Sequence, residues 1–337
     1  MQICRWPIFI AIFLLMPAGA RADSRLRTIQ HRGVLTCGVY PHVAGFAEID
    51  LHGRYVGFDV DICRALSAAI FGTADRVRFV EITTMTEFRK SDIDVVSRRL
   101  SWELRREFPL GFLFGPVMFY DGQGFLVAKK LAAATPLQLS RVPLCVANGK
   151  FEANIRAYFQ TKGLTLVQVP LKSAEDFKEI RDALETGRCS AYSADVTELG
   201  AIRSGMPHFE NFEILPQMIS KEPLAQLVRQ DDTQFFDILR WTVNALVYAE
   251  ELGIGSSNLD ETMSSNDRSV QIFLGVISGN GKALGLPERW AYAVIKAVGN
   301  YGEIFERNVG RDSPIKLDRG YNRLWSEGGL MYAPPLR

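Results

Sequence analysis

The chain has 337 residues, of which 47% are hydrophobic and 23% are charged, and its formal net charge is +1. This composition is too apolar for a disordered chain and too mixed for a polytopic membrane protein. The near-zero charge gives no sign of a nucleic-acid-binding surface or a polybasic membrane patch, so no nucleic-acid partner is expected. The length is sufficient for two compact units.

Residues 1–22 are predicted to form a cleaved secretory signal peptide. Arg5 supplies a positive charge, residues 6–16 form an apolar run, Pro17 interrupts it, and a small-x-small cleavage site follows at residues 20–22. A transmembrane anchor is the alternative, but a helix of that length spans only about 16 Å of a hydrocarbon core that is ~30 Å thick. We therefore expect an exported, periplasmic protein.

Loss of the signal peptide would remove Cys4 and leave Cys37, Cys63, Cys145 and Cys189. An even number of cysteines in an exported chain predicts two disulfides, for which three connectivities remain open. Four buried free thiols are the alternative. The sequence contains no CxxC and no Cys/His cluster that would indicate zinc, so no metal is expected.

From residue 34 onward, strand-like and helix-like segments alternate. Asp59 is the expected N-cap of a helix that ends at Gly72, with Asp61 adding negative charge to its first turn. The elements expected before residue 140 are strands over 34–39, 77–82 and 93–97, a hairpin or lead-in over 55–58, and helices over 59–72 and 86–91.

The same order of elements starts again after about residue 140. The elements expected here are strands over 143–147, 165–169 and 190–194, helices over 152–162 and 175–187, and a helical tail with helices over 233–252 and 290–298. Two strand-like segments, 124–129 and 223–230, are expected to join the two β-α-β units. This organisation predicts two α/β lobes connected by two crossings.

The sequence lacks GxSxG, HExxH and GxGxxG motifs. Residues 279–283, with the sequence GNGKA, faintly resemble a phosphate-binding loop but lack its upstream glycine and its final Ser or Thr, so a surface turn is expected there. The acidic pairs at residues 59 and 61 and at 92 and 94 are typical of helix starts and strand entries. An exported, two-lobed chain without catalytic motifs favours binding over catalysis.

Residues 57–62, GFDVDI, resemble the signature of family 3 extracytoplasmic solute-binding proteins, the amino-acid receptors of ABC transporters. The segments FDVDICRALSAAIFG, DGQGFLV, ISKEPL, VGNYGEIFERNVG and GGLMYAPPLR resemble the general L-amino-acid-binding branch of that family. Ser67 departs from the signature, because a smaller or apolar residue is usual at this position. The resemblance extends over residues 26–337.

The resemblance implies a two-lobed α/β architecture, the type II periplasmic-binding-protein fold, with two crossover hinge segments and a helical C-terminal tail. Residues 23–128 and 222–337 would form lobe 1, and residues 129–221 would form lobe 2. A ligand would bind in the cleft between the lobes, and a hinge motion would close the lobes over it.

This division places two cysteines in each lobe and so implies the pairs Cys37–Cys63 and Cys145–Cys189. The resemblance further implies a monomeric receptor that requires no cofactor and performs no enzymatic step. Its partners would be a small polar ligand, in the first place an amino acid, and an inner-membrane ABC permease.

The family resemblance also assigns roles to three residues. Arg106 matches the partner of the ligand carboxylate, Ser101 matches a hydroxyl and amide that assist it, and Asp195 matches the anchor of the ligand ammonium on the opposite lobe. Both charged ligand groups need charge-assisted hydrogen bonds in a cleft from which water is expelled. The alternatives are that Arg106 is a solvated cation and that Asp195 is a helix N-cap.

Three segments depart from the family pattern at the expected cleft, one of them the short helix near residues 86–91, which lacks about one turn. Arg99-Leu100 stand where an Asn-Thr-Thr stretch is usual, and Gly149-Lys150-Phe151 stand where glycine is followed by consecutive threonines. If Arg99 and Lys150 do not simply face solvent, three consequences are open. The cleft could prefer a ligand with an extra carboxylate such as glutamate, it could take a ligand without an α-ammonium, or amino-acid binding could be weakened or lost.

Two other classes of function are compatible with the same fold. A dehydratase acting on prephenate or arogenate would need a general acid above the bound carboxylate. A sensor would report the ligand to a membrane partner instead of delivering it for transport.

Overall fold

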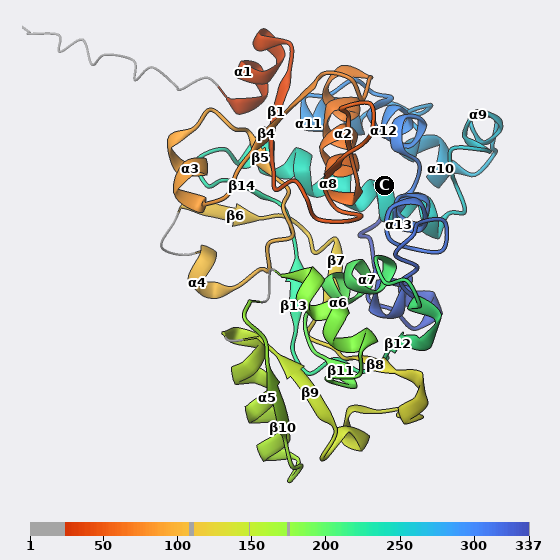
Figure 1. Cartoon of the computed structure of the whole chain (residues 1–337). Coiled ribbons are helices and arrows are strands. Elements are labelled where there is room, and N and C mark those ends of the chain that lie inside the picture. Colours follow the sequence, from red (N-terminus) through yellow and green to blue (C-terminus); the bar gives the residue numbers. More distant parts are fainter. Residues whose placement is uncertain (1–23, 108–110, 148, 174–175, 337) are drawn as a thin grey trace, which may run out of the picture.

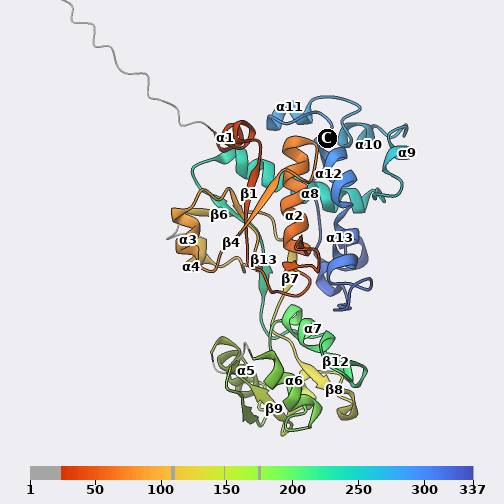
Figure 2. The ribbon, with the colours of Figure 1, turned by 45° about the horizontal axis from the view of Figure 1, so that its top comes forward.

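The computed structural model describes residues 24–107, 111–147, 149–173 and 176–336, so the predicted signal peptide lies outside the described residues. The chain forms two α/β lobes, the first at the top of Figure 1 and the second, largely green, below it. Strands β7 (Phe119–Asp121) and β13 (Glu222–Leu224) run between the lobes, as Figure 2 shows most clearly.

The first lobe is built from both ends of the chain. Its N-terminal elements are α1 (Arg25–Arg32), β1 (Leu35–Val39), β2 (Glu48–Ile49), β3 (Tyr55–Val56), α2 (Phe58–Phe71), β4 (Val77–Glu81), α3 (Met85–Lys90), β5 (Val95–Val96), α4 (Leu104–Glu107) and β6 (Phe112–Phe114). Its C-terminal elements are β14 (Leu227–Arg229), α8 (Thr233–Glu251), α9 (Leu259–Thr262), α10 (Arg268–Phe273), α11 (Asn280–Leu284), α12 (Trp290–Val298), α13 (Tyr301–Asn308), η4 (Gly320–Asn322) and η5 (Trp325–Glu327).

The second lobe is formed by the intervening segment. Its elements are β8 (Leu126–Ala128), η1 (Lys129–Leu131), η2 (Pro136–Leu139), β9 (Pro143–Val146), α5 (Lys150–Thr161), β10 (Val167–Pro170), α6 (Phe177–Glu185), β11 (Ala191–Tyr192), α7 (Val196–Ser204), η3 (Phe209–Asn211) and β12 (Phe212–Ile214). The β-α-β elements expected from the sequence are present with ends shifted by a few residues, although Glu175 of the expected helix lies outside the described residues.

The main sheets of the two lobes have matching strand arrangements. In the first, with the order β4-β1-β5-β14-β6, β1 is parallel to β4 and β5, whereas β14 is antiparallel to β5 and β6. In the second, with the order β10-β9-β11-β8-β12, β9 is parallel to β10 and β11, whereas β8 is antiparallel to β11 and β12. Each sheet therefore has four strands that run in one direction and a single reversed strand, β14 or β8, which directly follows a crossing.

The strand pairing corrects the expected positions of the crossings. The sequence predicts crossings over 124–129 and 223–230 and a change of lobe after residue 128, but β8 and β14 are internal strands of the two sheets. The crossing pair is β7 with β13. Short apolar runs have the same pattern in a sheet strand and in a connecting strand, so the pattern alone does not separate them. We accordingly place the first change of lobe between β7 and β8.

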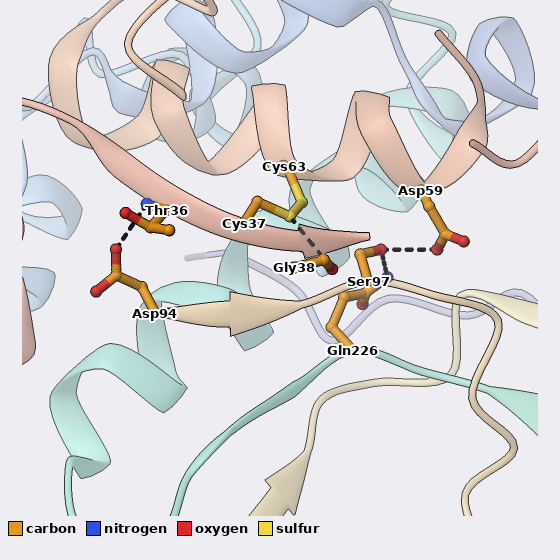
Figure 3. Close-up of a disulfide and its surroundings, with 8 residues drawn as sticks. All are labelled: Thr36, Cys37, Gly38, Asp59, Cys63, Asp94, Ser97 and Gln226. Atoms are coloured by element: carbon orange, nitrogen blue, oxygen red, sulfur yellow. Dashed lines mark hydrogen bonds between the residues drawn. A yellow bond between two sulfur atoms is a disulfide. The ribbon is translucent and has the colours of Figure 1, made fainter. Parts of the chain in front are cut away.

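The start of α2 also differs from the expectation. Its N-cap is Gly57 and not Asp59. Gly57 has a φ of 127°, and a Cβ atom there would lie 2.3 Å from the carbonyl oxygen of Phe46, so glycine is required. The buried Asp59 carboxylate instead accepts a hydrogen bond from the hydroxyl of Ser97 at 2.7 Å (Figure 3). Burial raises the pKa of Asp59 to about 6 despite this hydrogen bond.

Two other acidic residues of the expected pairs have structural roles. Asp61 accepts hydrogen bonds from Arg307 at 2.8 Å and from Asn308 at 2.7 Å, which joins α2 to α13. Asp94 accepts a hydrogen bond from the backbone amide of Thr36 at 2.7 Å (Figure 3). These contacts give both carboxylates structural roles.

The fragment that faintly resembles a phosphate-binding loop starts α11 and is not a simple surface turn. The backbone amides of Gly279 and Gly281 donate to the Glu288 carboxylate at 2.9 and 3.2 Å. A carboxylate of the chain itself therefore fills this position, where a helix N-terminus favours negative charge.

Both disulfides have the connectivity that the family resemblance implies. Cys37 of β1 is bonded to Cys63 of α2 (Figure 3), and Cys145 of β9 is bonded to Cys189, which lies between α6 and β11. The sequence separations are 26 and 44 residues. In the chain-entropy model, loops of these lengths correspond to roughly 3–4 kcal/mol of stabilisation each.

The second sheet is covered by helices on both faces, as the alternation along β9 shows. Leu144 and Val146 point to the same face as Ile155 of α5, whereas Cys145 belongs to the cluster that contains Ile180 of α6. In the part of the chain that the structure describes, no helix is both long and apolar enough to cross a membrane.

Candidate functional site at the junction of the two lobes

The crossing strands bring segments of both lobes to one point. β13 carries Glu222, and it pairs antiparallel with β7. An isolated bridge between Ser101 and Leu224 adds the segment before α4 of the first lobe. A second bridge, between Gln123 and Asp195, adds the start of α7 in the second lobe. The backbone therefore brings together segments that are far apart in the sequence.

Lys150, the first residue of α5, connects these groups. Its Nζ atom lies 3.3 Å from Oδ2 of Asp195 and 3.5 Å from Oε1 of Glu222. The other carboxylate oxygen of Glu222 accepts a hydrogen bond from the hydroxyl of Ser101. The Lys150 side chain is 53% exposed, whereas those of Asp195 and Glu222 are only 13% and 11% exposed. A cation that solvent can reach thus contacts two nearly buried carboxylates.

The two neighbours of Lys150 hold the start of α5. Gly149 is the N-cap with a φ of 112°, which L residues rarely adopt. Phe151 belongs to the core of the second lobe, and its ring centroid lies 4.9 Å from Nζ of Lys150. The Gln123 side chain donates a hydrogen bond to the Phe151 carbonyl at 3.0 Å and so ties α5 to the segment after β7. Of the two residues that replace the usual threonines, Lys150 presents its polar group to the junction, whereas Phe151 packs into the core.

Asp195 occupies the N-cap position of α7, but its side chain makes no capping hydrogen bond. Its Oδ2 atom faces Lys150, and its Oδ1 atom is buried without a hydrogen-bond partner. Burial raises the pKa of Asp195, the charge of Lys150 opposes this shift, and the carboxylate of Glu222 adds to it. The capping alternative therefore does not explain the orientation of this carboxylate, which retains an unused acceptor.

Arg106 lies in α4, on the first-lobe side of the junction. Its Nη1 atom donates to the carbonyl oxygen of Ser101 at 3.0 Å, and its Nη2 atom lies 3.4 Å from the carboxylate of Glu103. The side chain is 39% exposed. The structure thus brings Arg106 beside Ser101, where a ligand carboxylate could reach part of the guanidinium group.

Arg99 does not project freely into solvent. Its φ is 52°, its guanidinium carbon lies 5.3 Å from the ring centroid of Phe46, and its Nε atom is buried without a hydrogen-bond partner. Burial raises the pKa of Asp121 to about 6 and that of Glu198 to about 7, and the charge of Arg99 opposes both shifts. This arginine therefore lies among the carboxylates of the crossing and of α7.

Four residues of the junction received no role from the sequence. Asp121 and Gln123 lie in DGQGFLV and Glu222 lies in ISKEPL, two of the segments that carry the family resemblance, so those segments held a usable signal. Glu198, in the first turn of α7, lies in no such segment. Among the described residues, no group of three or more His, Cys, Asp or Glu side chains is placed to hold a metal ion.

Two α/β lobes with opposite charges at their junction define a two-lobed solute-binding protein. No protein-family model matches this sequence. The chain is 42% identical over 333 residues to the general L-amino acid-binding periplasmic protein AapJ of Rhizobium johnstonii, with 97% of each chain covered. It is 39% identical over 325 residues to the glutamate/glutamine/aspartate/asparagine-binding protein BztA of Rhodobacter capsulatus, with 95% of each covered.

A solved structure agrees with these relatives. The ABC transporter periplasmic binding protein from Brucella ovis with glutathione bound is 38% identical and has a TM-score of 0.81, covering 94% of this chain and 100% of that one. The chain belongs to the family of periplasmic amino-acid-binding proteins of ABC transporters.

Proposed function

We propose that this protein captures an L-amino acid between its two lobes and delivers it to an inner-membrane ABC permease. The observation that carries the proposal is the junction itself, where Ser101 of the first lobe and Asp195 of the second are linked through Glu222 and Lys150. A solute that binds there would contact both lobes, so its binding energy would favour the closed arrangement.

The charged groups suit the two ends of a zwitterion. The guanidinium group of Arg106 would receive the ligand carboxylate with help from Ser101, since its fork can form two parallel hydrogen bonds. Asp195 would receive the ammonium group, because its buried Oδ1 atom has no hydrogen-bond partner. Arg99 would add positive potential from the side of the crossing.

The comparisons support this class of ligand. AapJ is named as a binder of L-amino acids in general, BztA as a binder of glutamate, glutamine, aspartate and asparagine, and the Brucella protein holds glutathione. These solutes all combine an ammonium group with at least one carboxylate, which are the two groups that Asp195 and Arg106 would receive.

The remaining features of the proposal concern location and assembly. AapJ and the Brucella protein are named as periplasmic, and residues 1–22 would direct this chain across the inner membrane and be removed. We further propose a monomer that needs no cofactor and carries out no covalent step. Turnover of prephenate by the purified protein would contradict this and favour the dehydratase alternative.

A ligand screen tests the proposal directly. The purified exported form is melted with each of the common L-amino acids, and the hits are titrated by calorimetry. A ligand present at one hundred times its dissociation constant should add about 2.7 kcal/mol to the free energy of unfolding. If no amino acid shifts the melting curve or gives a binding isotherm, the proposed function is wrong.

A further inference from the structure

The side chain of Lys150 places an ammonium group where the ammonium group of an amino-acid ligand would bind. Its ammonium nitrogen contacts Oδ2 of Asp195 and Oε1 of Glu222. The backbone around it is fixed, because Gly149 sets the entry to α5 and Phe151 is buried in the second lobe. The local fold therefore positions the ammonium group beside these carboxylates, while the lysine side chain remains 53% exposed.

A ligand ammonium that binds to Asp195 must share this carboxylate with Lys150 or displace it. Sharing brings two positive charges close together in a partly desolvated region, where their repulsion is strong. Displacement from Asp195 leaves Lys150 with Glu222, whose other oxygen is already engaged by Ser101. A neutral amino acid offers no group that compensates for either outcome.

A ligand with a second carboxylate changes this balance. Its ammonium group can take the place of Lys150 at Asp195, and its second carboxylate can pair with the displaced Nζ atom. Each cation then retains an anionic partner. The lysine side chain can make this exchange because its backbone is anchored in α5, whereas the side chain itself is long and 53% exposed.

From this geometry we propose that Lys150 determines the specificity of the site, favouring solutes with one ammonium group and two carboxylates over neutral amino acids. The proposal rests on the proposed function and adds the substrate class to it. Acidic α-amino acids are the simplest members of that class. In its present position the lysine ammonium also lies 4.9 Å from the ring centroid of Phe151, a cation–π contact.

L-Glutamate and L-glutamine are the appropriate probes because they have the same shape and differ by one charge. Each is titrated by calorimetry into the wild-type protein and into the variants Lys150→Gln, Lys150→Arg and Lys162→Gln. Lys162 is an exposed lysine that follows the other end of α5, so its variant controls for a general loss of positive charge. Thermal melts without ligand establish that every variant is folded.

The wild-type protein and Lys162→Gln should bind glutamate at least ~10-fold more tightly than glutamine, a ratio that corresponds to about 1.4 kcal/mol. Lys150→Gln should bring this ratio to about one, through weaker glutamate binding and tighter glutamine binding, whereas Lys150→Arg should keep glutamate preferred. An unchanged ratio in Lys150→Gln would overturn the inference while leaving the proposed function intact. Binding of neither ligand to any variant, together with a negative screen of the other amino acids, would overturn both.

Discussion

Replacing Asp195 by alanine separates a ligand-binding role from a structural one. The residue occupies the N-cap position of α7, yet its side chain makes no capping hydrogen bond. Burial raises the pKa of this carboxyl group despite the contact with Lys150, so its ionised form is less stable in the folded protein than in water. The substitution should therefore leave the free energy of unfolding within about 1 kcal/mol of wild type.

Ligand affinity should respond much more strongly. A ligand ammonium at the distance that Lys150 now has from Asp195, 3.3 Å, would gain about 5 kcal/mol at an effective dielectric constant of about 20. Competition from Lys150 reduces this gain, so we expect Asp195→Ala to lose roughly 3 kcal/mol, or about 150-fold in affinity.

The assay combines calorimetry with urea unfolding on the same preparations. Asp267→Ala is the matched control, because Asp267 is an N-cap of the first lobe that accepts hydrogen bonds from the amides of Ser269 and Val270 at 2.7 and 3.4 Å. This variant should lose about 1 kcal/mol of stability and keep its ligand affinity. Unchanged amino-acid affinity in Asp195→Ala would refute the assignment of the ammonium anchor.

Three further predictions concern stability. Because the pKa of Glu198 is about 7 when folded, the folded state binds its proton more tightly than the unfolded state. Ionisation of Glu198 therefore lowers the free energy of unfolding progressively as pH rises from its ordinary pKa toward 7. The stability that the wild-type protein loses between pH 5 and pH 7.5 should be about 2 kcal/mol smaller in Glu198→Gln, as measured by urea titrations. An equal loss of stability in both proteins would contradict this. Replacing Cys145 and Cys189 by alanine should cost about 4 kcal/mol in the same assay, and peptide mapping without reduction should recover these cysteines as a pair. Gly57→Ala should lower the free energy of unfolding by more than about 3 kcal/mol, whereas Gly72→Ala, where a Cβ atom meets open space, should lower it by only about 1 kcal/mol. Equal losses would show that the backbone moves to relieve the contact between residue 57 and the carbonyl oxygen of Phe46.

Local patterns in the sequence were sufficient to predict the helices and strands whose formation depends on neighbouring residues. The alternation of strands and helices in residues 143–147 and 152–162 appears in the structure as β9 and α5. Four cysteines in an exported chain predicted two disulfides, and the family resemblance implied the correct pairs. The start of α2 was misplaced because Asp59 is a good N-cap by type, whereas the requirement for Gly57 comes from the distant Phe46.

The residues of the candidate site could be predicted only in part from the sequence. Residues such as Arg106 and Asp195 could be nominated because the family resemblance supplied positions for them. The contacts that give the junction its character join Ser101 to Glu222 across 121 positions and Lys150 to Glu222 across 72. No local period or motif encodes contacts of that separation.

The sequence by itself predicted an exported α/β chain with two disulfides that resembles the amino-acid receptors, because periodicity, cysteine number and short motifs are properties of neighbouring residues. The tertiary structure decided which strands cross between the lobes and which side chains meet there. It showed that Lys150, which the sequence left open as a solvent-facing residue, contacts Asp195 and Glu222. The physical reason is that the charge environment of a side chain depends on groups that only folding brings within a few ångströms of it.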